Sequence, residues 1–344
     1  MIMRFTGVLL LTLTSFLASA QNFQTPVEYM DFFSSREKLL SENYLSYMSE
    51  FAHGKRARKL EKRRSELIAS IRSALKDATR VSPFKGDATL RDAYKAYWDI
   101  ELKVFNEDYH KIVDMEEIAE QSYDAMEAYL LAQDKAGEVL SSAQDQIDPV
   151  LKAFASKNNV KLIEGGDSKM SKKLQQVGQV NAYNRGVYLI FFKSFKQEAY
   201  VIEAWNKKDI NSLEQNRTTL IRFAEEGLTK LDTMRAFKGD GSLVTACRKM
   251  LEFHKNEAEK DIPLQREFLV KNNEFEKVKK AFDSKPAAQR TQSDIDQYNK
   301  AINDINASVN ASNKSLQTVS VNRSKLLDNW NNTQKRFLDS HVPH

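Results

Sequence analysis

A seven-residue segment occurs twice in this chain of 344 residues. Phe-Lys-Gly-Asp-Ala-Thr-Leu at positions 84–90 returns as Phe-Lys-Gly-Asp-Gly-Ser-Leu at positions 237–243, which lie 153 residues further on. The match continues upstream in the same register, so that nine of the 27 positions from 64 to 90 are identical in the second copy. A repeat of this kind predicts that one structural unit occurs twice and that the fold contains both copies.

The N-terminal segment has the pattern of a secretory signal peptide. Arg4 precedes an apolar run from Phe5 to Leu17, and the small residues Ala18-Ser19-Ala20 follow it. The run is too short to span a bilayer comfortably, and Ala-Ser-Ala fits a cleavage site. We expect cleavage after Ala20 and export to the periplasm, the cell surface or the medium. An N-terminal membrane anchor is the alternative.

Cys247 is the only cysteine, so an exported chain of this sequence has no intramolecular disulfide. Its stability must come from packing. After a signal peptide at 1–20, we expect a first helical unit at 21–166 and a second at 167–344, each large enough to bury a core.

The composition favours helix along the whole chain, because only 11 glycines and 6 prolines interrupt it and alternating β-branched runs are almost absent. Thr25-Pro26-Val27-Glu28 predicts a capped helix start. Pro149 should kink a helix or restart it with Asp148 as the cap. We expect helices at about 26–53, 56–80, 88–113, 116–157 and 168–206, then from about 209, after Ser242, and after a break at 284–286.

The last of these helices has the clearest periodicity. From Ile295 to Phe337, the seam positions alternate spacings of three and four residues over six heptads, as in a coiled coil. Such a helix is long, so its neighbours should be long too. The sequence therefore predicts an all-α fold of two tandem, elongated, four-helix-bundle-like units. We favour packing of the seam within the chain over an intermolecular coiled coil.

The repeated Phe-Lys-Gly-Asp turn is one candidate interaction site. Lys85 and Asp87 flank a glycine in the first copy, and Lys238 and Asp240 do so in the second. A glycine with positive φ can bring backbone amides towards a ligand. The same residues are also what a turn needs to end one helix, bury an aromatic ring and cap the next helix, and we favour that structural role.

A dense basic run around the expected turn between the first two helices is the other candidate. Its leading members are Lys55, Arg56, Arg58 and Lys59. Such a run can contact anionic lipid head groups or polysaccharide, although a solvated helix end is the more common explanation. Because export separates the chain from nucleic acid, we expect no nucleic-acid partner.

No pattern in the sequence predicts catalysis, a metal or a cofactor. The histidines lack the spacing of zinc ligands, and no G-x-S-x-G segment is present. Cys247 occupies the position of Tyr94 in the first copy, which indicates a buried, inert thiol. His341 lies at an expected frayed end. We therefore expect a protein that is not an enzyme and that has no cluster of titratable groups with shifted pKa values. The histidines that lack zinc-ligand spacing are His53, His110, His254, His341 and His344.

The most apolar stretch of the exported chain is 187–195. Its segment Tyr188–Phe192 resembles Tyr29–Phe33 of the first unit, and we expect both to pack in the core. In a helical toxin such a stretch could enter a membrane, although it is too short to cross one.

With these features in place, the chain resembles an uncharacterised family of bacterial all-helical surface proteins. The residues that carry the resemblance are 84–87 with Leu90, and 237–240 with Leu243. The resemblance implies export and a surface or periplasmic location, and it implies no catalytic residue. We expect an interaction module whose partner is a protein or an envelope component of unknown identity. A helical pore-forming or membrane-perturbing protein is the alternative.

Overall fold

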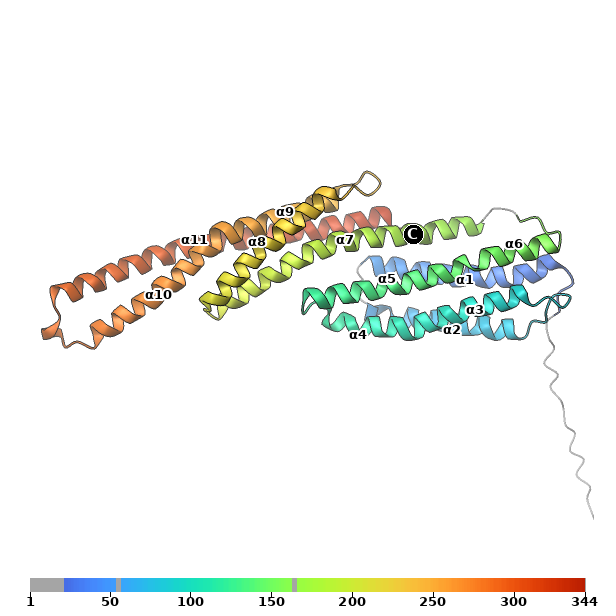
Figure 1. Ribbon diagram of the computed structural model, residues 1–344, viewed down its shortest axis with the longest axis horizontal. Helices are drawn as coiled ribbons and strands as arrows, with labels where there is room; N and C mark the ends of the chain where they lie inside the picture. Colours follow the sequence, from blue (N-terminus) through green and yellow to red (C-terminus); the bar gives the residue numbers. More distant parts are fainter. Residues whose placement is uncertain (1–21, 54–56, 163–165, 344) are drawn as a thin grey trace, which may run out of the picture.

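The computed structural model describes residues 22–53, 57–162 and 166–343. This part of the chain is all-α and has no β-strand, as the composition predicts. The molecule is elongated, and its helices run roughly along the long axis (Figure 1). The predicted signal peptide lies outside the described residues.

The first half consists of antiparallel helices that match the predicted order with some changes. A 3₁₀ turn precedes the second helix, and one π-helical turn interrupts the third, which we call the first π-turn. The elements are α1 (Pro26–Ala52), the 3₁₀ turn (Ala57–Leu60), α2 (Glu61–Thr79), α3 (Thr89–Lys103), the first π-turn (Val104–Asp108), α4 (Tyr109–Ala119), α5 (Tyr123–Asp145) and α6 (Ile147–Lys157).

The second half has a similar order of elements: α7, α8 and α10 are longer than α1, α2 and α4, whereas α9 and the second π-turn have the lengths of α3 and the first π-turn. A second π-turn again follows the third helix, and a short 3₁₀ turn lies at the far tip. The elements are α7 (Gly166–Asn206), α8 (Ile210–Thr233), α9 (Ser242–Asn256), the second π-turn (Glu257–Asp261), α10 (Ile262–Asp283), the 3₁₀ turn (Ala287–Gln289) and α11 (Gln292–His341).

Local capping explains several helix starts. Thr25 forms the predicted capping box with Glu28, which bonds back to the Thr25 N–H at 3.1 Å. Thr291 starts α11 in the same way. The prediction for Asp148 was wrong: the helix is interrupted at Gln146, which makes no side-chain cap, and Pro149 lies in the first turn of α6, where its missing N–H costs little.

Two predicted boundaries in the first half were also wrong. The third helix was expected to end near 113 and the fourth to begin near 116. Instead, helical structure continues through the first π-turn to Ala119, and the chain reverses at 120–122, where Ser122 caps α5 with a bond from the Ala125 N–H at 3.1 Å. A π-turn inserts one residue without ending the helix, so the periodicity shifts phase where the helix continues.

Helix α7 is the central element of the fold. It packs against α8 and α9 in its own half and against α1 and α5 in the other. No residue from Tyr183 to Val201 is exposed. The side chains of Val187, Phe191 and Phe192 are buried, so the prediction that this apolar stretch packs in the core is confirmed. In the described part of the chain, no helix has the length and apolar character needed to cross a bilayer.

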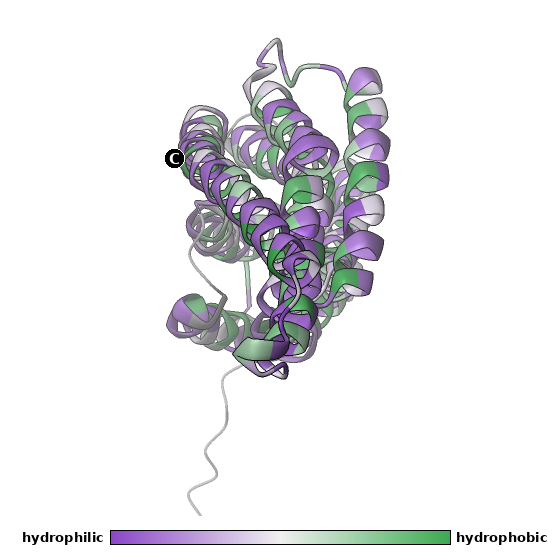
Figure 2. Cartoon of the chain, turned by 90° about the vertical axis from the view of Figure 1, so that its left-hand side faces the viewer, coloured by the Kyte–Doolittle hydropathy of each residue, from purple (hydrophilic) through white to green (hydrophobic). Residues whose placement is uncertain are grey.

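The main hydrophobic core runs through both halves and includes residues of α1, α3, α5, α7, α9 and α11. A second, smaller cluster lies further along α7 and joins it to α8 and α10. The apolar faces of the helices are turned towards each other, and the polar faces are turned outward (Figure 2). The buried seam of α11, which includes Val319, Trp330 and Phe337, packs within the chain as predicted.

The correspondence between the halves extends beyond the sequence repeat. Both π-turns lie at the 153-residue offset. In the first half, Tyr29 packs against Phe84 of the turn, with ring centroids 5.4 Å apart, and in the second half Tyr183 packs against Phe237 at 5.2 Å. Tyr29 therefore corresponds to Tyr183, and the sequence match to Tyr188 was wrong. The apolar runs 29–33 and 188–192 look alike in the sequence. In the structure, the residues that correspond between the halves are those whose rings contact the Phe-Lys-Gly-Asp turn.

A third ring completes each of these clusters. Its position shows where in the chain the two halves differ in length. Phe154 of α6 stacks on Tyr29 with an interplanar angle of 28°, and Phe337 of α11 stacks on Tyr183 at the same angle. The turns are 153 residues apart, but these two rings are 183 apart. The second half thus has 30 additional residues in the helical hairpin between its π-turn and its last ring.

Candidate functional site

The two Phe-Lys-Gly-Asp turns have the same backbone geometry. In the first, the backbone groups of Phe84 and Asp87 exchange hydrogen bonds of 3.0 and 2.9 Å, and in the second Phe237 and Asp240 do so at 3.0 and 2.8 Å. The lysine and glycine between them have positive φ in both copies, with Gly86 at 84° and Gly239 at 89°. Glycine adopts this conformation without the steric cost that a Cβ brings, which explains why both copies have it.

The aspartates of these turns serve the fold. Asp87 accepts hydrogen bonds from the Thr89 N–H at 3.0 Å and from Lys157 Nζ at 2.7 Å. Lys157 and then Thr89 lower the pKa of Asp87 to about 2. Asp240 accepts from the Ser242 N–H at 2.8 Å and pairs with His341 Nε2 at 3.0 Å. Each carboxylate therefore starts one helix and anchors the last helix of its half.

His341 was predicted to lie at a frayed end, and that was wrong. Its ring is partly buried and packs on Phe237 with centroids 5.2 Å apart.

The lysines of the turns differ from the aspartates in their surroundings. Lys85 and Lys238 are exposed, and each ammonium lies over the phenylalanine that precedes it, at 5.4 and 5.6 Å from the ring centroid.

The basic candidate residues are only partly described. Lys55 and Arg56 lie outside the described residues, as does the side chain of Arg58, whereas Lys59 is exposed. The next arginines have partners inside the fold. Arg63 pairs with Glu50, and Arg64 is buried between Glu61 and the Phe105 carbonyl oxygen. These arginines are used to attach α2 to its neighbours.

The structure also contains a buried polar cluster that the sequence analysis missed. Ser194 and Glu198 come from α7, His254 from α9, Glu257 from the second π-turn and Arg323 from α11. Ser194 Oγ lies 2.6 Å from His254 Nδ1, and Arg323 donates to Glu198 at 2.6 Å and to Glu257 at 2.7 Å. His254 Nε2 is 3.4 Å from Glu198 Oε2 but makes no hydrogen bond of good geometry.

Burial and mutual contact shift the two carboxyl groups in opposite directions. Burial raises the pKa of Glu257 to about 9, and the neighbouring Glu198 adds to that rise. Burial also acts to raise the pKa of Glu198, but His254, Glu257 and Arg323 together lower it to about 2. At neutral pH one carboxylate thus faces one guanidinium, and the second carboxyl group holds its proton. Arg323 compensates the charge of Glu198 in this buried position.

The first half has a related cluster at the same place. Glu101, 153 residues before His254, accepts a hydrogen bond from Tyr97 at 2.9 Å, and Trp98 donates to Glu37 at 2.9 Å. Burial raises the pKa of Glu101, and the charge of Glu37 raises it further. The prediction of no cluster of titratable groups with shifted pKa values was therefore wrong.

One local signal could have indicated the second cluster. His254 and Glu257 are three residues apart, a spacing that puts both side chains on one side of a helix. Their partners Glu198 and Arg323 come from distant segments, which one sequence does not bring together. Within the described ranges, no group of three His, Cys, Asp or Glu side chains is arranged to hold a metal ion.

An accessible hollow of about 310 Å³ lies where the two halves meet, and we call it the junction groove. Leu189, Ile190 and Met234 give it an apolar lining. Lys193 stands beside them, with its ammonium 4.2 Å from the Phe223 ring centroid and 2.8 Å from Glu226. The lining residues are Tyr123 and Glu127 of α5; Gly186, Leu189, Ile190 and Lys193 of α7; Phe223, Glu226, Gly227 and Lys230 of α8; and Met234.

The two glycines of the junction groove have different roles. A Cβ on Gly227 would lie 2.8 Å from Leu251 Cδ1 and 3.1 Å from Ile190 Cγ2, so this glycine lets α8 approach its neighbours closely. A Cβ on Gly186 would meet only Met234 Cε, at 3.8 Å. Gly186 therefore leaves room in the groove. None of the buried cluster residues lines the groove.

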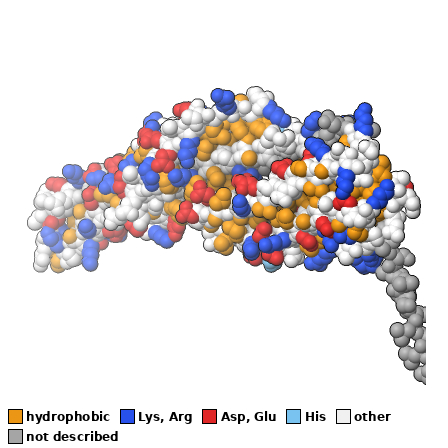
Figure 3. Space-filling model, turned by 45° about the vertical axis from the view of Figure 1, so that its right-hand side comes forward, with side chains coloured by type: hydrophobic (Ala, Val, Ile, Leu, Met, Phe, Trp, Pro, Cys, Tyr) orange, Lys and Arg blue, Asp and Glu red, His pale blue; other side chains and the backbone are white. Residues whose placement is uncertain are grey.

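Hydrophobic side chains gather over the middle of the molecule on one face, whereas acidic and basic side chains alternate along the thin end (Figure 3). Comparisons with protein-family models, with curated proteins and with solved structures found no match.

Proposed function

We propose that this chain is an exported helical protein that acts by binding a protein or an envelope component and not by catalysis. Its location is the periplasm, the cell surface or the medium. The junction groove is its contact surface. The pair of helical units inferred from the repeated turn forms a scaffold that holds the groove in a fixed shape. The resemblance to exported all-helical surface proteins agrees with this proposal.

The groove is the observation that carries the proposal. It combines an apolar lining with charged groups at its edge, and its volume is in the range of small binding sites. Residues of α5 from one half and of α7 and α8 from the other form it together, so its shape depends on the way the halves pack. Sites of this kind occur preferentially where two units meet.

The position of the reactive groups supports a binding function. Ser194 and His254 are fully buried, and Glu198 and Glu257 are nearly so. Their polar atoms are engaged mainly with one another and with Arg323. A reacting group must reach its substrate within hydrogen-bond distance. These residues therefore serve the interior of the protein in our proposal.

The test is a pair of glycine substitutions in one helix. Gly186→Leu places a side chain in the groove, whereas Gly178→Leu places the same side chain where a Cβ meets nothing within 4 Å. A photoreactive residue at position 223 would report capture in the native envelope. We expect one defined partner with the parent chain and with Gly178→Leu, and at least a tenfold loss with Gly186→Leu. Equal capture by both variants would contradict the proposal.

A vesicle assay separates this function from the membrane-perturbing alternative. The proposal predicts no release of trapped dye from anionic or neutral vesicles over a range of pH. Dye release that depends on protein concentration would favour the alternative.

A further inference from the structure

The second half carries an extension that the first half lacks. The 30 additional residues lengthen the hairpin of α10 and α11, which protrudes beyond α7 and α8 at the end of the molecule (Figure 1). We call residues 270–304 the arm. No residue of the arm is buried. It therefore adds nothing to either hydrophobic core.

The arm is nevertheless a well-formed hairpin. Phe282 stacks on Tyr298 with centroids 4.4 Å apart and an interplanar angle of 10°. Near the tip, Lys285 pairs with Asp294 at 2.5 Å, and the capping box of Thr291 fixes the start of α11. In proteins, helices gain most of their stability from tertiary packing of an apolar face. A hairpin of this length gains much from a surface that covers it.

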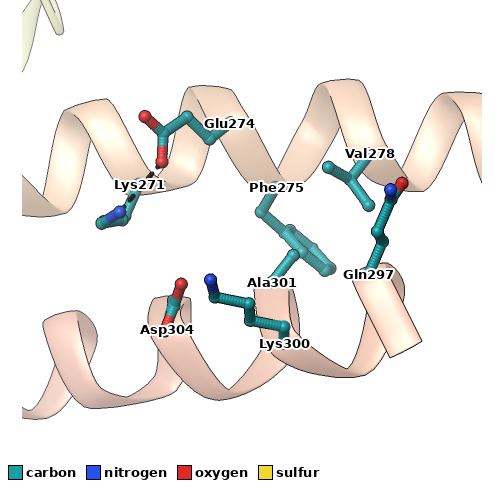
Figure 4. A pocket seen from close by; sticks show the side chains of 8 residues that line it. All are labelled: Lys271, Glu274, Phe275, Val278, Gln297, Lys300, Ala301 and Asp304. Atoms are coloured by element: carbon teal, nitrogen blue, oxygen red, sulfur yellow. Dashed lines mark hydrogen bonds and ion pairs between the residues drawn. The ribbon is translucent and has the colours of Figure 1, made fainter. Parts of the chain in front are cut away.

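A groove of about 320 Å³ runs between the two helices of the arm. Phe275 and Val278 of α10 and Ala301 of α11 form its apolar centre (Figure 4). Charged groups flank that centre, with one lysine and one carboxylate from each helix. They are Lys271 and Glu274 of α10, and Lys300 and Asp304 of α11.

A second copy of the arm offers the same balanced set of charges and the same apolar centre. In a two-fold interface, each contact between residue i and residue j occurs twice, so a surface must complement itself. A groove with one positive and one negative group on each helix meets that requirement, and its balanced charge does not attract a strongly charged partner. Two helical hairpins that cover each other's apolar centres form an antiparallel four-helix arrangement, which is a common way to bury such faces.

We propose that the arm binds the arm of a second copy of this chain, so that two molecules join end to end through a two-fold contact around Phe275. This proposal does not depend on the junction groove. A stable interface uses roughly 20–30 residues on each side, whereas only about half of the 35 arm residues face one way. We therefore expect a weak, reversible dimer.

Sedimentation of the purified chain from about 1 to about 500 µM tests the proposal, because a weak dimer forms only at high protein concentration. We expect a monomer at the low end and a dimer at the high end. Phe275→Glu should remain monomeric throughout. Leu131→Glu changes an exposed apolar residue of α5 in the same way and should dimerise like the parent chain. A parent chain that stays monomeric over the whole range would overturn the proposal.

Because Phe275→Glu could also loosen the arm, charge exchange provides a second test. Lys271→Glu with Lys300→Glu makes the groove acidic, and Glu274→Lys with Asp304→Lys makes it basic. Each double variant alone should lose at least tenfold in dimer affinity, and an equimolar mixture should recover it as a heterodimer. Failure of the mixture to associate, with circular dichroism showing both variants fully helical, would overturn the proposal.

Discussion

Arg217 donates a hydrogen bond from Nη1 to the carbonyl oxygen of Ala258, at 3.2 Å, inside the second π-turn. Arg64 makes the same contact with the carbonyl oxygen of Phe105 in the first π-turn. A π-turn inserts one residue, so a backbone carbonyl loses its regular helical partner and needs another donor. Each arginine supplies that donor from the second helix of its half and is held by a glutamate three residues before it.

Arg217→Ala should therefore destabilise the chain by about 2 kcal/mol, because it removes a charged donor and leaves a carbonyl oxygen unpaired. Arg222→Ala, in the same helix, removes an exposed i,i+4 ion pair and should cost less than about 0.5 kcal/mol. Urea unfolding followed by circular dichroism measures both. Equal effects of the two substitutions would mean that the π-turn does not depend on Arg217.

Glu257 should make the chain less stable as the pH rises. Its pKa is about 9 in the folded chain, well above its ordinary value of 4.5, so the folded state keeps a proton that the unfolded state releases. The stability that this proton provides is complete below pH 4.5 and is lost as the pH rises towards 9. Glu257→Gln keeps a neutral side chain and should be more stable than the parent chain at pH 9.

Thermal unfolding at pH 5 and pH 9 measures this effect, with the exposed Glu276→Gln as the control. Glu198 works in the other direction, because its pKa is lowered to about 2: its contribution is present above pH 4.5 and fades as the pH falls. Because Glu198 is unchanged in Glu257→Gln, this variant should lose stability at low pH in the same way as the parent chain. A variant that loses stability in parallel with the parent chain up to pH 9 would contradict the prediction.

Asp87→Ala should cost about 1–2 kcal/mol at neutral pH, since it removes the group that starts α3 and anchors Lys157. The folded pKa of about 2 lies below the ordinary 3.8, so the difference from the parent chain should shrink as the pH falls from 4 to 2. Lys85→Ala, at an exposed position of the same turn, should stay within about 0.5 kcal/mol. Guanidinium unfolding at several pH values distinguishes these outcomes.

Two glycines of helical segments should respond in opposite directions to alanine. Gly227→Ala places a Cβ 2.8 Å from Leu251 Cδ1, and overpacking of this kind costs about 1–3 kcal/mol. Gly178→Ala meets open space and should stabilise the chain by about 0.5–1 kcal/mol through helix propensity. Melting temperatures give the sign directly, and a stabilising Gly227→Ala would show that α8 can move away from α7 and α9 at little cost.

Cys247 should not react with thiol reagents in the folded chain. Its side chain is fully buried, and burial raises the pKa of the thiol to about 12, so both access and the reactive thiolate are lacking. A chromogenic disulfide reagent should label it only in denaturant, with a rate that follows unfolding. Rapid labelling of the native chain would be inconsistent with this packing.

Much of the secondary structure follows from local chemistry. The starts of α1 and α8, the helical character of α7 and α11, and the glycine turns depend on caps, composition and φ preferences that a few neighbouring residues determine. The role of Asp87 and Asp240 as structural residues could also be read from the turn pattern. The π-turns could not, because nothing in Val104–Asp108 differs from an ordinary helix until Arg64 meets it from another element.

The candidate site depends still more on distant contacts. Leu189 and Phe223 line one groove only because α7 packs against both α5 and α8. Glu198, His254 and Arg323 meet only because three helices align at one level. Short-range interactions are enough to specify that the chain is helical, where most helices begin, and that one turn occurs twice. Tertiary structure decided the register of the two halves, the length of the arm and the pairing of buried charges, because those depend on side chains far apart in the sequence sharing the same space.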